Sequence, residues 1–462
     1  MWTHLGGLQA SVLPSVPGFR VWLGTMTSCA FLDELRWRGL LHQTTDDAGL
    51  AQHLGSGLRA AYVGFDPTAD SLTIGNFIPI KLLMHFQQAG HRPIAVLGGG
   101  TGLIGDPSGK SAERQLLTRD RVEQNVNSQR RIFERLLDFS AGPRSASLIN
   151  NLDWLGSLSF IDVLRDVGKH FSVNAMIQRD SVRDRLQNRE QGISYTEFSY
   201  MILQAYDFLH LHQKQGVTLQ MGGSDQWGNI VSGSDLIRRI NHPTQPGESG
   251  TADSFGLTAP LVTRADGGKF GKSESGAIWL SADRTSPYAF YQFWLNTADE
   301  DVVRYLKLFT FLPQDEIAAL ASEHERNAGG RAAHRALARH MTQLLHGEGE
   351  RSQAEAAAQA LFSGDIAGLS AATLREALAS APTSSHARTL LAGEGLSLID
   401  VLAECGLCKS KREAREFAQT GAVLVNGRKA TPDDRLTERD LLHGEFIALR
   451  RGKKNWHLLR YA

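Results

Sequence analysis

From Ala60 to about Ile230 the chain alternates strand-like apolar runs with helical patterns, and this alternation restricts the possible folds more than any other feature. The chain contains, in order, the strand-like run AAYVGF, the helical run IPIKLLMHFQQAG and the strand-like run HRPIAVL, with glycine-rich turns after the strands. This order is typical of a parallel sheet that binds ligands at the carboxyl ends of its strands. We therefore predict an α/β fold with a Rossmann-like nucleotide-binding domain.

Two short segments indicate the kind of nucleotide. TIGN, at Thr73 to Asn76, follows the first strand and opens a helix, where backbone N–H groups can bind phosphate. KFGKS, at Lys269 to Ser273, places two lysines and a hydroxyl on a glycine-containing loop. The loop GGGTGLIG after the second strand continues into DPSGK rather than into a long helix. It therefore favours ATP over a dinucleotide.

The composition excludes several classes of protein. Lys and Arg total 49, as do Asp and Glu, so the net charge indicates no partner and any nucleic-acid surface must be local. No stretch approaches the ~18 apolar residues that a membrane span needs. Cys29, Cys405 and Cys408 are too few for a disulfide framework, which predicts a reducing compartment, the cytoplasm. We interpret Cys405 and Cys408 as two small helix residues rather than a metal or redox site.

Basic charge is concentrated near the C-terminus. From Lys409 onward the chain has 13 Lys and Arg against 7 Asp and Glu, within a pattern of helix, strand, Asn-Gly turn and strand. A solvated basic face would explain such a run, but the compact pattern favours contacts with RNA phosphates. The residues predicted to contact RNA are Lys411, Arg412, Arg415, Lys453 and Lys454.

Polar side chains line one face of a predicted helix. In GISYTEFSYMILQAYDF, Tyr200, Gln204 and Asp207 fall at i, i+4 and i+7, which places them on the same face. Apolar residues crowd this helix, so the polar face is predicted to be a buried pocket wall rather than a solvated stripe. The next segment, LQMGGSDQWGN, places Asp225 and Gln226 at a glycine turn after a strand, where a ribose or an amino acid could bind.

The chain carries, in the order found in one family, the motifs GFDPTADSL, GGTGLIGDPSGK, GKHFSVN, SYTEFSYMILQAYDF, QMGGSDQWGN, KFGKSESG and TSPYAFYQFW. TIGN and KFGKS resemble the two signature sequences of class I aminoacyl-tRNA synthetases. Over nearly all of Phe31 to Ala462 the chain resembles the bacterial-type tyrosyl-tRNA synthetases. The resemblance implies a tyrosine-tRNA ligase. Such an enzyme activates L-tyrosine with ATP to tyrosyl-adenylate plus pyrophosphate, and then transfers tyrosine to the 3′-terminal adenosine of tRNA(Tyr).

The resemblance also implies a homodimer, Mg²⁺ that arrives with ATP, and no protein-bound metal or organic cofactor.

Residues 1–27 contain a single Arg and two Pro, a composition that fits a targeting peptide poorly and favours a disordered extension or an incorrectly assigned start. Residues 241–253 predict a surface loop. The expected division is an extension at 1–30, a Rossmann-like catalytic domain with a dimer-forming insertion at 31–259, a KFGKS loop linker at 260–287, a separate helical anticodon-binding domain at 288–379, a linker at 380–395 and a small α+β S4-like RNA-binding domain at 396–462.

Residue roles follow from the same resemblance. Tyr62 and Asp207 would bind the substrate phenol, and Asp106, Tyr200 and Gln204 would bind its ammonium group. The tyrosine-binding set is completed by Gln220 and Gln226. The residues expected to bind ATP or the adenylate are Gly64, Asp66, Gly75, Gly223, Asp225 and Lys272. The catalytic residues, expected to lie against the phosphates, are Thr68, Thr73, Asn76, Lys110, Arg114, Lys269, Lys272 and Ser273.

Three positions depart from the family pattern. Family members usually have histidine where this chain has Thr73 and again where it has Asn76, and Val63 stands where a cysteine often touches ribose. Asn76 can still donate a hydrogen bond, whereas Thr73 is shorter and uncharged, and Val63 offers no polar atom. We expect each loss to weaken transition-state contacts by roughly 1 kcal/mol, a few-fold in rate. The prediction is a slower but functional enzyme.

Two other functions fit parts of the sequence. A related class I synthetase for tryptophan would share the fold, but Tyr62 together with Asp207 argues against it. A non-catalytic RNA-binding protein could have kept the scaffold after losing amino-acid activation, and Thr73 is the main residue that favours this alternative.

Overall fold

The computed structural model describes residues 29–108, 116–179, 182–183, 186, 192–242, 253–273, 276–379, 381–452 and 455–462. The extension predicted at 1–30 and the loop predicted at 241–253 therefore lie almost wholly outside the described residues. Among the helices that are described, none combines the length and the apolar character that a membrane crossing requires.

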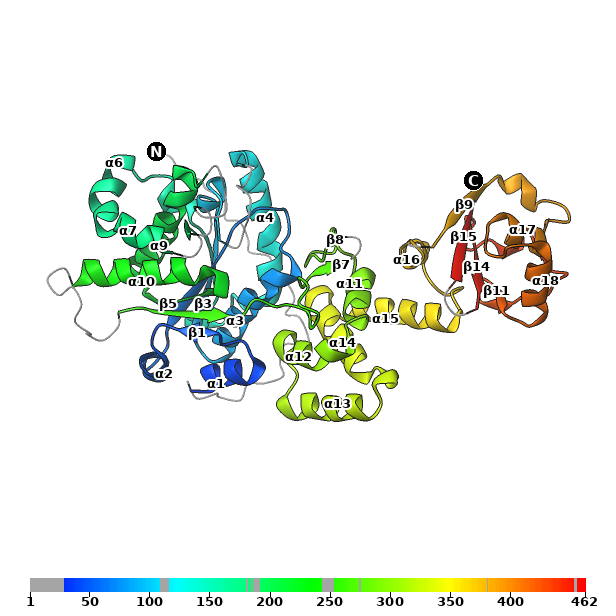
Figure 1. The fold of residues 1–462 in the computed structure, drawn as a ribbon, viewed down its shortest axis with the longest axis horizontal. Helices are drawn as coiled ribbons and strands as arrows, with labels where there is room; N and C mark the ends of the chain where they lie inside the picture. Colours follow the sequence, from blue (N-terminus) through cyan, green and yellow to red (C-terminus); the bar gives the residue numbers. More distant parts are fainter. Residues whose placement is uncertain are drawn as a thin grey trace, which may run out of the picture.

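A six-stranded sheet forms the centre of the N-terminal part (Figure 1). Its order is β1-β6-β5-β2-β3-β4, and all neighbours are parallel except the edge pair β1 and β6. The strands are β1 (Gln43–Thr44), β2 (Ala60–Phe65), β3 (Arg92–Leu97), β4 (Ser147–Asn150), β5 (Val217–Gly223) and β6 (Phe255–Ala259). Strands β2 and β3 cover the two predicted strands, so the predicted parallel sheet is confirmed.

The strand order creates a switch point beside β2. The chain passes from β2 to β3 and β4 on one side, then returns to place β5 on the other side of β2. Connections diverge at such a point and leave a crevice at the carboxyl ends of the strands, where α/β proteins bind ligands.

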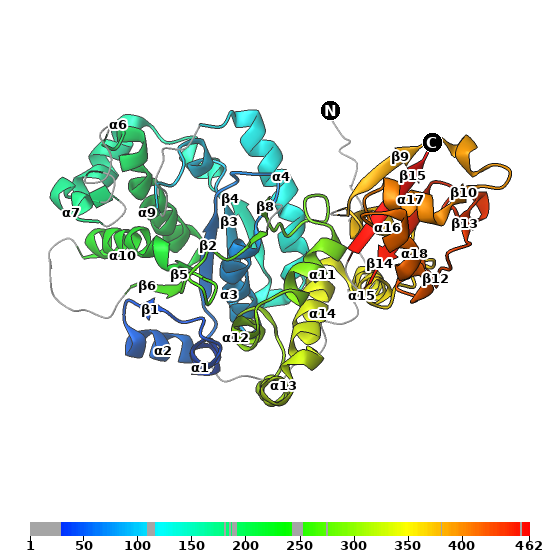
Figure 2. The ribbon, with the colours of Figure 1, turned by 45° about the vertical axis from the view of Figure 1, so that its right-hand side comes forward.

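Helices cover both faces of the sheet (Figure 2). Ala61 and Val63 of β2 belong to the core that includes helix α3, whereas Tyr62 belongs to the core against α9 and α10. This alternation follows from the two-residue period of a strand, and burial on both faces explains why β2 is apolar almost throughout. The helices of this part are α1 (Cys29–Arg38), α2 (Asp47–Gly55), α3 (Phe77–Gln88), α4 (Arg119–Leu136), α5 (Leu152–Leu155), α6 (Phe160–Asp162), α7 (Val173–Ile177), α9 (Tyr195–Gln215) and α10 (Trp227–Asn241).

Helix α9 has a clear signal at each end. The Ser194 hydroxyl accepts a hydrogen bond from the Glu197 N–H at 3.2 Å, which pairs one of the donors that the first turn leaves open. Gly216, at φ 64°, ends the helix in the left-handed conformation that glycine adopts without strain. The predicted polar face therefore lies on a helix whose register is fixed at both ends.

A group of helices follows the sheet, as the periodicity predicts. It consists of α11 (Pro287–Leu295), α12 (Asp299–Phe309), α13 (Gln314–Arg326), α14 (Ala332–His346), α15 (Glu348–Ser363) and α16 (Ala371–Ala377). One hydrophobic cluster runs from Phe31 in α1 to Ala354 in α15. This region was predicted as a separate domain, but its core is continuous with that of the sheet.

Two basic side chains from the sheet region cap the end of α12. Lys81 of α3 donates from Nζ to the carbonyl oxygens of Leu308, at 3.0 Å, and Thr310, and Arg38 of α1 donates to Thr310 O at 2.9 Å. Lys81 is fully buried, and this burial lowers its pKa well below the ordinary value. Cations are favourable at a helix C-terminus, where carbonyl groups lack partners. The contact fixes α3, which begins directly after TIGN, to the helical region.

The C-terminal part is a small α+β unit connected through α15 and α16 (Figure 1). Its five-stranded sheet has the order β12-β11-β14-β15-β9, and β10 pairs separately with β13. The strands are β9 (Thr383–His386), β10 (Leu396–Ser397), β11 (Val423–Val425), β12 (Arg428–Lys429), β13 (Arg435–Leu436), β14 (Phe446–Arg451) and β15 (Asn455–Tyr461), and the helices are α17 (Leu398–Glu404) and α18 (Lys411–Gln419). The predicted Asn-Gly turn joins β11 to β12, with both residues at positive φ.

Two features of this part differ from expectation. Residues 383–386 of the predicted linker form β9, which pairs parallel with the last strand, so they belong to the C-terminal sheet. Cys405 and Cys408 lie after the end of α17, in its connection to α18, and not within a helix as predicted. Both are free thiols.

Candidate active site

A cavity of about 700 Å³ opens at the carboxyl ends of β2, β3 and β5, where the strand order predicts a ligand. It brings together residues that are up to about two hundred positions apart in sequence. All seven residues predicted to bind tyrosine line it: Tyr62, Asp106, Tyr200, Gln204, Asp207, Gln220 and Gln226. Of the residues predicted to contact ATP or its phosphates, those that line it are Gly64, Asp66, Thr68, Thr73, Gly75, Asn76, Gly223, Asp225 and Lys269.

One end of the cavity holds a buried carboxylate. Asp207 is 4% exposed, and its two oxygens accept hydrogen bonds from Asn151 Nδ2 at 2.8 Å and from the Trp154 indole N–H at 2.7 Å. The Tyr62 hydroxyl is buried with no hydrogen-bond partner among the described residues. A buried hydroxyl without a partner costs free energy, and a ligand that bonds to it removes that cost.

Asn151 and Trp154 were not predicted from the sequence. They follow β4 in the segment NNLDWLG, and α5 places both side chains against Asp207 of α9. The sequence signal that could have found Asn151 is a polar residue directly after a sheet strand, at the edge where ligands bind. No comparable signal marks Trp154.

Burial dominates the electrostatics of this end. It raises the pKa of Asp207 to about 7, although the hydrogen bonds from Asn151 and Trp154 favour the ionised form. The same cause, followed by the charge of Asp207, raises the pKa of Tyr62 well above its ordinary value. The Tyr62 hydroxyl therefore stays protonated.

A second polar chain lines the middle of the cavity. Gln226 Nε2 donates to Asp106 Oδ2 at 2.8 Å, and Gln204 Nε2 donates to Gln226 Oε1 at 3.3 Å. Asn229 Nδ2 then donates to Gln204 Oε1 at 2.9 Å. Asn229 was not predicted, although it lies in the quoted segment LQMGGSDQWGN. These contacts fix the Asp106 carboxylate and the amides of Gln204 and Gln226, which line the cavity.

Tyr200, predicted to bind the ammonium group together with Asp106 and Gln204, lines the same cavity and bonds to Asp66. Its hydroxyl donates to Asp66 Oδ2 at 2.9 Å, and Thr101 Oγ1 donates to Asp66 Oδ1 at 2.8 Å. The Asp66 carboxylate thus connects Thr101, in the turn after β3, to Tyr200 of α9.

Glycines permit close approach at two places in the lining. A Cβ added to Gly64 would meet no protein atom within 4 Å, so a ligand can lie directly against this backbone. A Cβ on Gly223 would lie 2.5 Å from Asp225 Oδ1, which shows that glycine leaves room for that carboxylate. Both fit the predicted contacts with a nucleotide.

TIGN and KFGKS lie side by side. Thr73 forms a β-bridge with Trp279, and the Ile74 N–H donates to Ile278 O at 2.9 Å. Gly271 of KFGKS, at φ 79°, approaches Ile74 so closely that an added Cβ would lie 2.8 Å from its side chain. Phe270 packs among aromatic side chains of the helical region, including Phe309 at 4.9 Å between ring centroids. The loop is therefore fixed on both sides.

The Thr73 side chain is engaged locally. Its hydroxyl donates to Asn76 Oδ1 at 2.8 Å, and its backbone N–H donates to the same oxygen at 3.0 Å. The carboxamide oxygen of Asn76 thus fixes Thr73, and its Nδ2 has no acceptor among the described residues. Asn76 is the better placed of the two to donate to a ligand.

Several predicted residues remain without structural description or lie elsewhere. Lys110, Arg114, Lys453 and Lys454 lie outside the described residues, as does the Ser273 side chain. Lys272 is exposed on β7 (Lys272–Ser273), which pairs with β8 (Gly276–Ala277), and it does not line the cavity. Lys411, Arg412 and Arg415 lie exposed on α18 of the C-terminal part, as the helical spacing predicts.

Two family models match the chain. Residues 58–363 match the model described as tRNA synthetases class I (W and Y), and residues 377–459 match that of the tyrosine–tRNA ligase SYY-like C-terminal domain. The tyrosine–tRNA ligase of Geobacillus kaustophilus is 52% identical over 432 residues, covering 93% of this chain and 99% of the relative. Tyrosine–tRNA ligase 2 of Enterococcus faecalis is 50% identical over 433 residues, covering 94% and 99%.

Solved structures give a consistent result. A C-terminally truncated mitochondrial tyrosyl-tRNA synthetase from Aspergillus nidulans matches with a TM-score of 0.65 at 32% identity, covering 72% of this chain and 94% of that one. The tryptophanyl-tRNA synthetase of Plasmodium falciparum matches with a TM-score of 0.50 at 13% identity, covering 73% and 89%. At 13% identity, the match to the tryptophanyl-tRNA synthetase shows a shared fold only.

Proposed function

The chain belongs to the tyrosine–tRNA ligases of the class I tRNA synthetases, and from this premise we propose that tyrosine and ATP react in the cavity beside β2. The observation that carries the proposal is the buried end of the cavity, where Asp207 and the unpartnered Tyr62 hydroxyl lie. A phenol hydroxyl entering there would donate to the carboxylate and accept from Tyr62. Phenylalanine would leave the Tyr62 hydroxyl without a partner and would offer Asp207 no donor beyond Asn151 and Trp154, which is the basis for its rejection.

The polar chain in the middle of the cavity fits the other end of the amino acid. Asp106 offers a carboxylate for the ammonium group, and Gln226 and Gln204, bonded to it in series, fix its orientation. A desolvated ammonium requires such a charge partner. We place the tyrosine carboxylate beside Gln226, between the ammonium site and the glycine-lined nucleotide site.

No side chain needs to act as a nucleophile or general base. The tyrosine carboxylate attacks the α-phosphorus of ATP in line, a carboxylate–phosphorus bond forms, and pyrophosphate leaves with the bonding electrons. Catalysis then consists of positioning and of neutralising the charge that develops on the phosphates. Asn76 and Lys269 line the cavity where this charge would lie. Lys272, Lys110 and Arg114 stay predicted sources of positive charge for the phosphates. Mg²⁺ would accompany ATP through phosphate oxygens.

The raised pKa of Asp207 predicts pH-dependent binding of tyrosine. The ionised carboxyl accepts the phenol hydrogen bond, so tyrosine favours the deprotonated form and its binding should release a proton below pH 7. With the pKa near 7, affinity should weaken about tenfold between pH 8 and pH 6. Titration calorimetry at both pH values measures this, with Asp207→Asn as the variant that should lose the dependence. Equal affinities in the wild-type protein would contradict the assignment.

Thr73 gives a second prediction. Because its short hydroxyl is bonded to Asn76, Thr73 contributes little to phosphate binding. Thr73→His should therefore lower the activation free energy of tyrosine-dependent pyrophosphate exchange by about 1 kcal/mol, which raises the rate a few-fold. Thr73→Ser keeps the hydroxyl and should leave the rate unchanged. If Thr73→His is no faster than wild type, Thr73 does not limit catalysis.

We propose that the C-terminal part binds tRNA during transfer of tyrosine to the terminal adenosine. Lys411 and Arg412 on α18 are 67% and 90% exposed, and they pair with the carboxylates of Asp400 and Glu416. Such exposed ion pairs are weak, so RNA phosphates can replace the carboxylates as partners. The helical region, between this part and the sheet, would bind the anticodon.

The charging reaction tests this assignment. Replacing Lys411, Arg412 and Arg415 together with alanine should lower kcat/KM for tRNA by roughly tenfold, with a weaker salt dependence, because three phosphate contacts are lost. Tyrosine-dependent pyrophosphate exchange, which needs no tRNA, should be unchanged. A charging rate equal to that of wild type would place the RNA surface elsewhere.

Exposed apolar side chains support a homodimer. They lie between residues 160 and 195, on and around α6 and α7, and Figure 1 shows these two helices at the opposite end of the molecule from the C-terminal part. The members of this surface are Phe160, Ile161, Leu164, Val173, Ile177, Leu186 and Tyr195. Apolar patches of this kind mark interfaces with other chains. Sedimentation should return twice the 50.6 kDa chain mass, and a monomer would exclude the proposal.

The predicted cytoplasmic location stays a prediction.

A further inference from the structure

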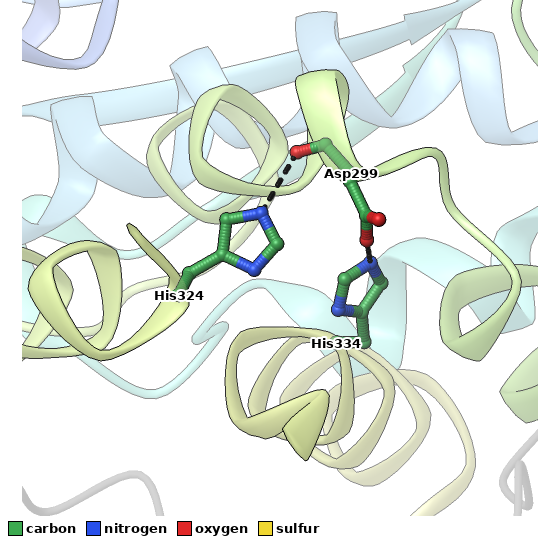
Figure 3. A group of neighbouring side chains, drawn as sticks. All are labelled: Asp299, His324 and His334. Carbon is green, nitrogen blue, oxygen red and sulfur yellow. Dashed lines mark hydrogen bonds and ion pairs between the residues drawn. The ribbon is translucent and has the colours of Figure 1, made fainter. Parts of the chain in front are cut away.

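Three side chains from successive helices of the helical region meet away from the proposed active site. Figure 3 shows Asp299 at the start of α12, His324 near the end of α13 and His334 at the start of α14. One donor atom from each residue lies within 4.8 Å of the donors of the other two. His334 Nε2 is 3.2 Å from Asp299 Oδ1. None of these residues has a role in the reaction described above.

The histidines have nitrogen atoms to offer. His334 is 0% exposed, and neither of its ring nitrogens makes a well-aligned hydrogen bond among the described residues, although the Thr297 backbone lies close to the ring. Buried polar atoms in native proteins rarely lack partners, so this ring requires an explanation. A neutral imidazole carries one lone pair that can bind a metal ion.

His324 is oriented as a ligand as well. Its Nε2 lies 3.1 Å from the backbone oxygen of Asp299, which can only accept, so Nε2 carries the proton. In the neutral ring Nδ1 then has the lone pair, and Nδ1 is also buried with no partner in the part of the chain that the structure describes. A hydrogen bond from the second nitrogen to a carbonyl is the arrangement that fixes the tautomer of metal-binding histidines.

We propose that Asp299, His324 and His334 form a Zn²⁺ site that joins α12, α13 and α14. Two imidazoles and a carboxylate are a donor set that zinc accepts, with three protein ligands and water in the fourth position. Zinc requires distances of about 2.0–2.2 Å to such donors, so small side-chain rotations would close the cluster around the ion. The Asp299 side chain is 52% exposed, which gives the ion a path from solvent.

Arg331 is the group that opposes a cation here. Its Nη1 lies 3.8 Å from Asp299 Oδ1. The guanidinium also donates to Leu295 O at 2.5 Å, so it can stay on the end of α11 while the carboxylate turns toward zinc. Arg331 should therefore lower the affinity without excluding the ion, and Arg331→Gln is expected to bind zinc more tightly than wild type.

The test uses the full-length chain, stripped with a chelator and titrated with zinc chloride against a chromophoric zinc indicator. We expect one zinc per chain in wild type. In His324→Gln the affinity for zinc should fall by roughly a hundredfold or more. Removing a residue that only hydrogen-bonds to a metal ligand already lowers metal affinity by up to about a hundredfold, and this variant removes a ligand itself. His324 lies at the surface end of α13, so this variant should keep its fold, which circular dichroism checks.

Two controls make the result specific. His346→Gln changes a second buried histidine of α14 that lies outside the cluster, and Cys408→Ser removes a thiol of the C-terminal part that could bind zinc. Both should keep the wild-type stoichiometry and affinity. The proposal is overturned if wild type binds no zinc, or if His324→Gln binds it as tightly as wild type.

Discussion

Replacing Asp207 with alanine should lower kcat/KM for tyrosine in pyrophosphate exchange by roughly a hundred- to a thousandfold, about 3–4 kcal/mol. The substrate phenol would lose a charged acceptor in a desolvated site. Asn151 and Trp154 would also be left with buried donors that no longer have an acceptor. Phenylalanine never used the carboxylate, so its kcat/KM should change by less than about threefold.

The selectivity ratio is the decisive quantity in this experiment. Asp235→Ala, on an exposed part of α10 outside the cavity, is the matched control and should leave both substrates unaffected. Differential scanning calorimetry would show whether the Asp207 variant remains folded. If the ratio of tyrosine to phenylalanine is unchanged in a folded Asp207→Ala protein, the phenol does not bind at this end of the cavity.

The second large effect concerns stability. Lys81→Met should lower the free energy of unfolding by about 2–4 kcal/mol, because the methionine fills the space but leaves carbonyl groups at the end of α12 without their donor. Arg38 still donates to Thr310 O, whereas Leu308 O keeps no such charged partner among the residues that the structure describes. Urea denaturation followed by circular dichroism measures the loss.

Lys307→Met is the control for the Lys81 experiment. Lys307 lies on α12 itself with a partly exposed side chain, so the same change of residue should cost less than about 0.5 kcal/mol. Because α3 begins next to TIGN, the Lys81 variant should also slow pyrophosphate exchange. A variant as stable as wild type would show that the capping of α12 does not hold the two regions together.

The sequence predicted the sheet and the cavity lining because their signals are local. The apolar run of β2 and the helical spacing of Tyr200, Gln204 and Asp207 each lie within a single element. Their convergence then follows from the rule that carboxyl ends of parallel strands share one edge. The roles of Tyr62 and Asp106 came from resemblance to a family rather than from spacing.

The partners of those residues could not be predicted in the same way. Asn151 lies 56 positions before Asp207, and nothing in the local pattern connects the two. Lys81 lies in the apolar run IPIKLLMHFQQ, where the sequence alone favours a lysine at the surface. Only the packing of α12 against α3 shows that its ammonium group is buried and bonded to α12. Strand β9 has the polar sequence TSSH, and only its pairing with the last strand of the chain defines it.

Pyrophosphate exchange with tyrosine, tryptophan and phenylalanine supplied separately, in the absence of tRNA, tests the central claim most directly. The cavity beside β2 predicts rapid ATP-dependent exchange with tyrosine, slight exchange with phenylalanine and none above background with tryptophan. Exchange with tryptophan but not tyrosine would contradict the assignment of the buried end to a phenol. Absence of exchange with every amino acid, with affinity for tRNA retained, would show instead that the chain keeps the scaffold without the activation chemistry.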